Sequence, residues 1–272
     1  MDNLPEITQA AAVRLITSAK GGVGKSTVCA NLGMALALMG KRVLLIDCDT
    51  ANRCLDLLLG LEDTAMWGIR DVCEGTLPLS DAIYPSPTQP NLHLLPGSRV
   101  TADAINEIVS GLPACIKEAG QLGYDHILID TPGGLHEILF AAAALCEEAL
   151  IVSSAQNTAI RSAEQTADLL SEHGVPAMRL IVNQFMPADA LTRRRSSARA
   201  RNAAVTTLIA AVDSVSLSLL GVIPFDAGLW EAQNKGQLID HPAAAPTHFA
   251  AAHRNIAQRL TGRTVPLFSD GR

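Results

Sequence analysis

Two lysines and three hydroxyl side chains lie within one glycine-rich segment, Ser18–Thr27, with the sequence SAKGGVGKST. Glycines at this spacing let backbone N–H groups turn toward a phosphate, and a helix that begins directly after them adds positive potential. In such a loop Lys25 contacts the β- and γ-phosphates of a nucleotide, and the Ser26 hydroxyl coordinates Mg²⁺. The segment therefore predicts a nucleotide and Mg²⁺ site. Its phosphate-binding residues are Lys20, Gly21, Gly22, Val23, Gly24, Lys25, Ser26 and Thr27.

Three aspartates follow apolar runs that are typical of buried strands. Asp47 and Asp49 come after VLLI, and Asp130 ends the run HILID. Ligands gather at the carboxyl edge of a parallel sheet, and a carboxylate there holds Mg²⁺, usually through water. We expect this role for Asp130 and, through water, for Asp47. The alternative for Asp47, and also for Asp49, is that the carboxylate caps the following turn.

The elements that position these residues alternate along the chain. Several runs are almost continuously apolar, as strands covered on both faces are, and longer Ala- and Leu-rich helical patterns separate them. One helix is predicted over Lys25–Met39, with Gly40 as its stop. The pattern predicts one doubly wound α/β domain with a mostly parallel sheet and helices on both faces. Its strands are Val13–Ser18, Arg42–Asp47, Asn91–Leu95, His126–Asp130, Ala149–Ser153, Arg179–Asn183 and Leu219–Ile223.

Composition narrows the class of protein. The 272 residues carry a formal charge of -6, so the chain lacks the overall basic character of a nucleic-acid binder. None of its six cysteines forms a C-x-x-C pair, and reduced thiols are expected. The longest apolar run, Ile138–Ala155, contains Glu147 and Glu148, so no membrane-spanning helix is predicted. Two stretches interrupt the alternation of predicted strands and helices. They are a proline-rich loop at Tyr84–Pro90 and an arginine cluster at Arg193–Arg201.

The run KGGVGKST resembles the deviant Walker A motif of the MinD/ParA family of ATPases, and the resemblance extends from about Val13 to Pro266. The strict P-loop pattern has glycine at position 19, and the family tolerates Ala19. The resemblance implies that Lys20 reaches across an ATP-dependent homodimer to the partner's nucleotide, as an arginine finger does. It also implies that Asp49 positions the attacking water.

The same resemblance suggests how the base of ATP is bound. Asn183 ends the strand RLIVN, and its amide is able to hydrogen-bond the Watson–Crick edge of adenine. The run GVIPFD matches a later loop of the family, in which Pro224 and Phe225 pack on the base. The alternative for Phe225 is an ordinary core or lid aromatic.

Within the family the chain is most similar to the MinD branch, through RCLDLLLGLE (53–62), NLHLLPGS (91–98) and GVIP…N.G (221–236). This resemblance implies ATP hydrolysis in septum site selection, with a division-inhibitor or other regulatory partner. A ParA-like partition ATPase and a flagellar or secretion-system placement ATPase, each acting as a nucleotide-gated scaffold, remain alternatives. His136 stands where MinD proteins usually have Glu, which bears on contacts with partners, and Cys54 stands where Asn is common.

The sequence divides into an N-terminal extension (1–12), the ATPase domain (13–262) and a short tail (263–272). Gly262, Pro266 and Gly271 interrupt the tail, so we expect it to lack the basic amphipathic helix with which, as the resemblance implies, MinD proteins bind the membrane surface. In the preceding helix an apolar stripe is interpreted as core packing, and its members are Phe249, Ala252, Ile256 and Leu260. We expect a cytoplasmic protein with weak membrane association through a partner.

Overall fold

A computed structural model of the chain describes residues 10–98, 102–186, 208, 210, 212–213, 215–233, 235–240 and 247–267. These residues form an eight-stranded sheet in the order β3-β4-β2-β5-β1-β6-β7-β8. Neighbouring strands are parallel, except that β3 and β4 are antiparallel. The strands are β1 (Ala12–Thr17), β2 (Val43–Asp47), β3 (Tyr84–Pro85), β4 (Leu92–Leu95), β5 (His126–Asp130), β6 (Glu148–Ser154), β7 (Met178–Phe185) and β8 (Ser218–Pro224).

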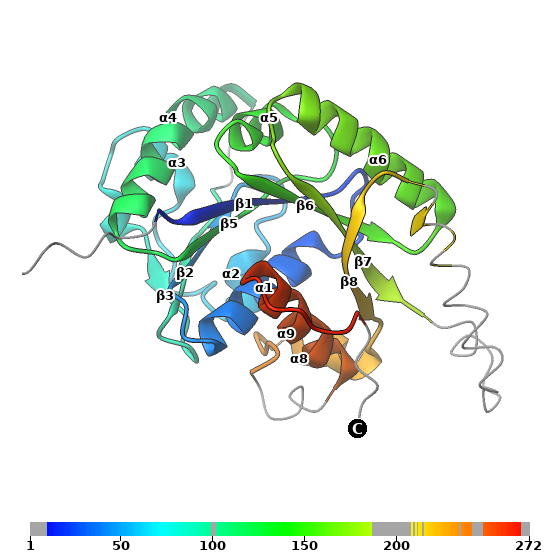
Figure 1. Cartoon of the computed structure of the whole chain (residues 1–272). Coiled ribbons are helices and arrows are strands. Elements are labelled where there is room, and N and C mark those ends of the chain that lie inside the picture. The colour runs from blue at the N-terminus through cyan, green and yellow to red at the C-terminus, as the bar shows by residue number, and fades with distance from the viewer. Residues whose placement is uncertain are drawn as a thin grey trace, which may run out of the picture.

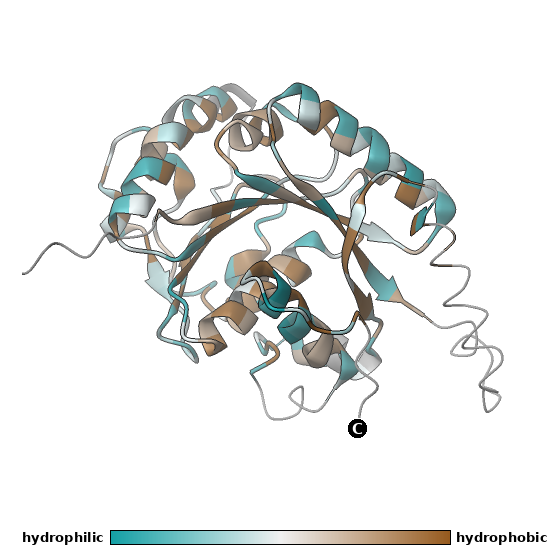
Figure 2. Ribbon diagram, viewed as in Figure 1, coloured by the Kyte–Doolittle hydropathy of each residue, from teal (hydrophilic) through white to brown (hydrophobic). Residues whose placement is uncertain are grey.

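Helices cover both faces of the sheet (Figure 1). One face carries α3 (Ile69–Cys73), α4 (Ala102–Gln121), α5 (Glu137–Ala143) and α6 (Asn157–Glu172), with the short 3-10 helix η1 (Leu79–Asp81) nearby. The other face carries α1 (Lys25–Leu38), α2 (Leu55–Leu59), α8 (Ala227–Gln233) and α9 (His248–Leu260). Two clusters of buried aliphatic side chains fill the two interfaces, and Figure 2 shows the strands between them as mostly hydrophobic. The predicted fold class is confirmed.

The seven predicted strands all form, with ends shifted by one or two residues at most. The helix predicted over Lys25–Met39 also forms, and Gly40 ends it with a φ of 82°. The prediction of a loop throughout Tyr84–Pro90 is wrong at its start, because β3 pairs with β4 there. Pro85 fits this position because β3 is the edge strand of the sheet, where proline's missing N–H is tolerated.

The C-terminal helix α9 packs against α1 and β8. The predicted stripe is buried along its length, which confirms the interpretation as core packing. Residues 263–267 form no helix, and the Arg259 guanidinium donates hydrogen bonds to the carbonyls of Val265 and Leu220. Within the described residues, no helix has both the length and the apolarity needed to cross a bilayer. Residues 1–9, the Arg193–Arg201 cluster and residues 268–272 lie outside the described residues.

Candidate nucleotide-binding site

The glycine-rich loop joins the end of β1 to the start of α1, at the carboxyl edge of the sheet. Gly22 and Gly24 have φ angles of 79° and 84°, left-handed conformations that other residues rarely adopt. The Ser18 hydroxyl donates to the carbonyl oxygen of Lys20 at 2.7 Å and fixes the start of the loop. The N-terminal turn of α1 therefore lies directly behind a glycine-rich turn, the arrangement that binds phosphate.

Two charged side chains are buried here without a hydrogen-bond or ion-pair partner among the described residues. Lys25 is 7% exposed, and its ammonium forms no ion pair or hydrogen bond with any described residue. Asp130 is fully buried, and neither of its carboxylate oxygens has a hydrogen-bond partner within the described part of the chain. Burial raises the pKa of Asp130 to about 7, an effect that the nearby Ser26 hydroxyl and Lys25 partly offset. Because unpaired buried charges are costly, this pair indicates a site for a charged ligand.

Asp47 is the last residue of β2 and lies opposite Asp130 in the strand register. Its two carboxylate oxygens accept the backbone N–H groups of Asp49 at 2.9 Å and Leu55 at 3.2 Å. Burial, followed by the charge of Asp130, raises the pKa of Asp47. The structure thus shows the capping role that we kept as the alternative. It also brings Asp47 beside Asp130, and a role at Mg²⁺ through water stays a prediction.

Asp49 lies with Lys25 and Ser26 in the wall of a hollow of about 600 Å³. Its carboxylate accepts the backbone N–H groups of Ala51 at 3.2 Å and Asn52 at 3.1 Å. The amide nitrogen of Asn52 also donates to the second carboxylate oxygen at 3.1 Å. These bonds orient Asp49, and the spacing of Asp and Asn along the turn is the sequence signal that would have identified Asn52.

A second glycine-rich loop, after β5, touches the phosphate loop. The N–H of Gly134 donates to the carbonyl of Ser18 at 3.2 Å. A Cβ at Gly133 would lie 3.1 Å from the Cα of Gly21, so any larger residue would push the two loops apart by a few tenths of an ångström. His136 is exposed, and its Nε2 lies 3.0 Å from the carbonyl oxygen of Gly133. A change at the phosphate site would therefore reach this loop directly.

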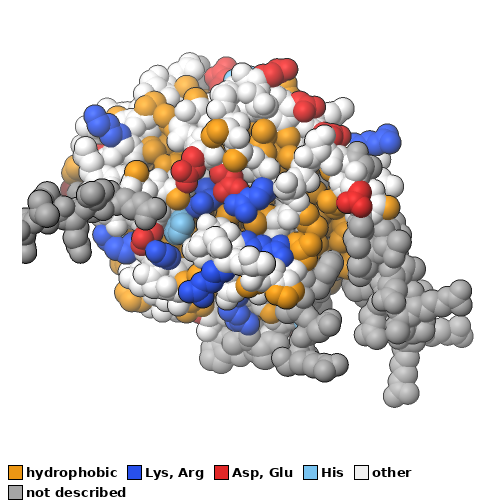
Figure 3. Space-filling model, viewed as in Figure 1, with side chains coloured by type: hydrophobic (Ala, Val, Ile, Leu, Met, Phe, Trp, Pro, Cys, Tyr) orange, Lys and Arg blue, Asp and Glu red, His pale blue; other side chains and the backbone are white. Residues whose placement is uncertain are grey.

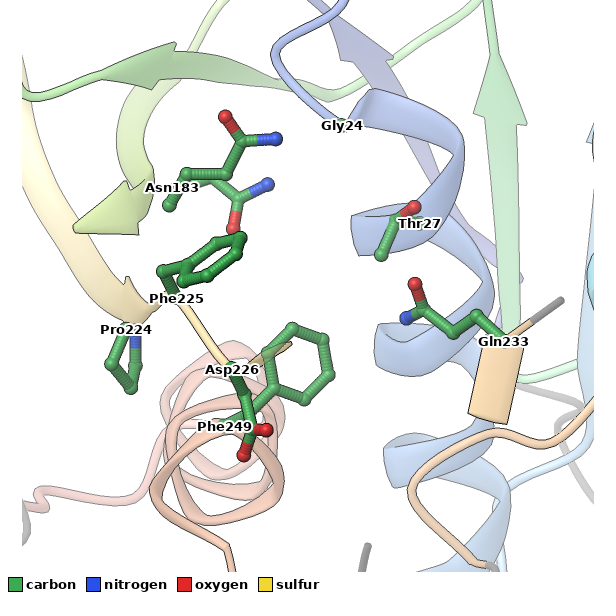
Figure 4. A pocket seen from close by; sticks show the side chains of 9 residues that line it. Gly24, Thr27, Asn183, Pro224, Phe225, Asp226, Gln233 and Phe249 are labelled. Atoms are coloured by element: carbon green, nitrogen blue, oxygen red, sulfur yellow. The ribbon is translucent and has the colours of Figure 1, made fainter. Parts of the chain in front are cut away.

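A smaller hollow of about 100 Å³ adjoins the phosphate loop and contains the predicted base-binding residues Asn183, Pro224 and Phe225. Asn183 and Phe225 lie on one side of it, and Thr27 lies on the other (Figure 4). The Asn183 amide is already engaged, because it donates to the carbonyl of Val23 at 2.9 Å. That the Asn183 amide hydrogen-bonds the adenine base stays a prediction. Phe225 is 50% exposed, which favours a rim position over the core alternative.

Sequence reasoning missed two glutamines at this place. Gln184 and Gln233 line both the larger and the smaller hollow, together with Gly24 and Thr27 of the loop. Neither glutamine belongs to a motif, so no pattern in a single sequence singles them out. Only the fold, which brings the end of β7 and the end of α8 over the loop, shows their position.

The residues present fit a magnesium nucleotide. Within the described residues, no group of three or more His, Cys, Asp or Glu side chains is able to hold a metal alone. Mg²⁺ in nucleotide sites is held by one or two carboxylates, water and the phosphates, which matches the orphaned Asp130 beside Ser26. Lys25 would meet the phosphates.

A parallel α/β sheet with a glycine-rich loop between its first strand and helix defines a P-loop nucleotide-binding protein. A family model described as the CobQ/CobB/MinD/ParA nucleotide binding domain matches residues 15–239. The chain belongs to this family.

Two relatives are septum site-determining MinD proteins. The one from Synechocystis is 35% identical over 256 residues, covering 93% of this chain and 90% of the relative. The one from Bacillus subtilis is 33% identical, with the same coverage of each chain. The predicted resemblance to MinD is therefore confirmed.

Solved structures give the same result. The MinC:MinD cell division protein complex of Aquifex aeolicus matches with a TM-score of 0.76 and 33% identity, covering 94% of this chain and 98% of that chain. MinD of Pyrococcus horikoshii complexed with Mg-ADP matches with a TM-score of 0.75 and 29% identity, covering 92% and 96%. A ParA family ATPase of Chlorobium tepidum is 22% identical and shows the fold alone.

Proposed function

We propose that this chain is an ATP-dependent switch of the MinD type. It binds ATP and Mg²⁺, closes into a homodimer, hydrolyses ATP to ADP and phosphate, and reopens. The observation that carries the proposal is the buried Lys25 beside the buried Asp130, neither of which has a partner among the described residues. The Mg-ADP bound to the Pyrococcus horikoshii relative supports the choice of ligand. The names of the relatives support a role in septum site selection.

Each side chain of the site has a separate role in ATP hydrolysis. Lys25 and the loop backbone hold the phosphates, while Ser26 and Asp130 hold Mg²⁺, with Asp47 acting through water. When bound, Mg²⁺ neutralises charge on the phosphate oxygens. Asp49, fixed by the donors of its own turn, orients the attacking water.

The second lysine is proposed to act in the partner subunit's site. Lys20 is exposed and forms no ion pair within the described residues, so its ammonium is available to a second copy. A cation supplied in this way stabilises charge that develops during phosphoryl transfer. Hydrolysis therefore depends on dimerisation.

A regulatory protein is proposed to bind beside the loop after β2 and the loop after β5, the two loops that would respond to the presence of the γ-phosphate. A hollow of about 490 Å³ lies there, between Thr50 and Ala51 of one loop and Pro132, Leu135 and His136 of the other. Leu135 is half exposed. The complex of the Aquifex aeolicus relative with MinC supports a partner of this kind. We place the protein in the cytoplasm, with weak membrane association through that partner.

The rate of ATP hydrolysis per chain, measured over a range of protein concentrations, tests the proposal. The wild type should show a rate that rises with concentration as dimers form. Lys20→Ala should keep nucleotide binding and lose this rise in rate. Lys41→Ala, which removes an exposed ion pair with Asp125 outside the nucleotide site, should show the same rise as the wild type. Equal rates for the wild type and Lys20→Ala would refute the role of Lys20 in the partner's site.

Vesicle co-sedimentation tests the membrane proposal. With ATP and vesicles that contain anionic lipid, the isolated protein should remain mostly in the supernatant. Strong sedimentation with the vesicles would contradict association through a partner.

A further inference from the structure

One buried polar group in the nucleotide site has no hydrogen-bond partner among the described residues and no role in the function proposed above. Gln233 is the last residue of α8, and its amide nitrogen is buried without a hydrogen-bond partner in the described part of the chain. Buried amide groups almost always find a partner, because an unpaired donor costs about 1–3 kcal/mol. The same side chain lines both hollows of the site. A ligand that enters the site is the natural source of the missing acceptor.

The fold holds Gln233 firmly over the phosphate loop. The turn after α8 contains Gly236, which has a φ of 67° and whose N–H donates to the carbonyl of Gln233 at 3.0 Å. A Cβ at Gly236 would lie 3.0 Å from the Cα of Gly60, so the turn packs tightly on the end of α2. This contact ties the position of Gln233 to the face of the sheet that carries α1 and α2.

Gln233 faces the predicted base-binding wall. Figure 4 shows its carboxamide extending from the opposite side of the smaller hollow toward Phe225 and Phe249. Two other polar groups of the hollow have partners: the Asn183 amide donates to the carbonyl of Val23, and the Asp226 carboxylate accepts the N–H of Gly228 at 3.0 Å. The apolar wall suits the flat face of a heterocycle, whose edge then meets Gln233.

We propose that Gln233 reads the base of the nucleotide. A carboxamide offers one donor and one acceptor side by side, which match a ring nitrogen and the exocyclic amine of adenine. Its nitrogen donates to the ring nitrogen, and its oxygen accepts from the amine. Gln233 is then a residue that determines preference for ATP. This inference rests on the proposed function, because it assigns a further contact within the same ATP site.

The substitution Gln233→Glu tests the assignment, since it keeps the shape and replaces the donor by an acceptor. Calorimetric titration of the full chain with Mg²⁺ and non-hydrolysable analogues of ATP and GTP gives both affinities. In Gln233→Glu the affinity for the ATP analogue should fall about tenfold, which corresponds to about 1.4 kcal/mol. The ratio of GTP to ATP affinity should rise, because a carboxylate accepts from the N1–H and amine of guanine. Gln237→Glu, which adds the same charge four residues later outside both hollows, should change neither affinity.

Two results would overturn the inference. One is an unchanged affinity of Gln233→Glu for the ATP analogue. The other is an equal loss for both analogues, which would mean that the new charge merely repels phosphate. If Gln233→Glu does not unfold cooperatively, Gln233→Met is measured instead and should lose the preference for ATP. A wild type that binds neither analogue would refute the proposed function itself, whereas a wild type that binds ATP while the variants keep its preference would refute only the role of Gln233.

Discussion

Buried charges differ between the two ends of the strands, which we call the carboxyl edge and the amino edge of the sheet. At the carboxyl edge, Lys25 and Asp130 are buried and have no partner among the described residues. At the amino edge, the buried Arg14 donates to Glu148 at 2.8 Å and to Nδ1 of His126 at 2.9 Å. Glu148 also pairs with Arg179. Figure 3 shows acidic and basic side chains gathered around a histidine on one face of the molecule.

The same strands carry both edges, which makes the contrast informative. β1 holds Arg14 near its start and leads into the phosphate loop, and β5 begins with His126 and ends with Asp130. The amino-edge charges satisfy one another, so their role is to hold β1, β5, β6 and β7 together. The carboxyl-edge charges lack such partners in the described chain, which is why we propose that they meet a ligand. Substitutions at the two edges should therefore separate stability from binding.

Lys25→Met should give the largest effect, on binding alone. It removes charge-assisted hydrogen bonds to phosphate, each worth about 1.5–3 kcal/mol, so nucleotide affinity should fall roughly 100-fold or more. The free energy of unfolding without nucleotide should change little, because the attraction between Lys25 and the nearby Asp130 is offset by the cost of burying the Lys25 ammonium. Urea unfolding and nucleotide titration measure the two quantities. A large loss of stability without nucleotide would show that Lys25 has a structural role.

Arg14→Met should give the reverse result. The substitution leaves the buried Glu148 with Arg179 alone and should lower the free energy of unfolding by about 2–3 kcal/mol. Nucleotide affinity of the folded protein should be unchanged. Lys41→Met, which breaks an exposed pair with Asp125 at the same edge, is the matched control and should cost far less. An equal loss of free energy of unfolding in both variants would mean that burial of the Arg14 cluster does not add to stability.

Much of this arrangement was predictable from the sequence, for identifiable physical reasons. Strands buried on both faces need continuous apolar runs, so VLLID and HILID revealed β2 and β5 and placed Asp47 and Asp130 at their ends. The phosphate loop was predictable because its glycines and lysines are contiguous. Local patterns of this kind carry their own structural information.

Contacts between distant segments were not predictable in this way. Arg14 and Glu148 are 134 positions apart and meet only because β1 and β6 are neighbours in the sheet. The capping of Leu55 by Asp47 depends on how the chain turns after β2, and the position of Gln233 depends on the packing of one turn against Gly60. Each requires the register of the assembled fold, which no short motif contains.

Asp130→Asn should raise the stability of the nucleotide-free protein by about 1 kcal/mol near pH 7.5, since it removes a buried charge without a partner in the described chain. Because burial raises the pKa of Asp130 to about 7, its stabilising contribution is complete below pH 4 and is lost as the pH rises through 7. The advantage of Asp130→Asn in free energy of unfolding should therefore grow from pH 4 to pH 7.5. Added Mg-ATP should stabilise the wild type more than the variant. A constant advantage at all pH values would contradict the raised pKa.

The amino edge should respond to pH with the opposite sign and the smallest amplitude. Burial, and then the charge of Arg14, lower the pKa of His126 to about 4 from its ordinary value of 6.5. The unfolded chain therefore takes up a proton between pH 6.5 and pH 4 that the folded protein does not. His126 thus contributes stability above pH 6.5 that is lost as the pH falls toward 4.

His126→Asn retains an acceptor for Arg14 and removes this titration. The free energy of unfolding of the variant should fall less steeply between pH 6.5 and pH 4 than that of the wild type, by no more than about 1.4 kcal/mol per pH unit, the limit for one proton. If His126→Asn kept the wild-type slope, the pKa of His126 would not be lowered by its place beside Arg14. The amino edge would then lack the paired network that sets it apart from the nucleotide site.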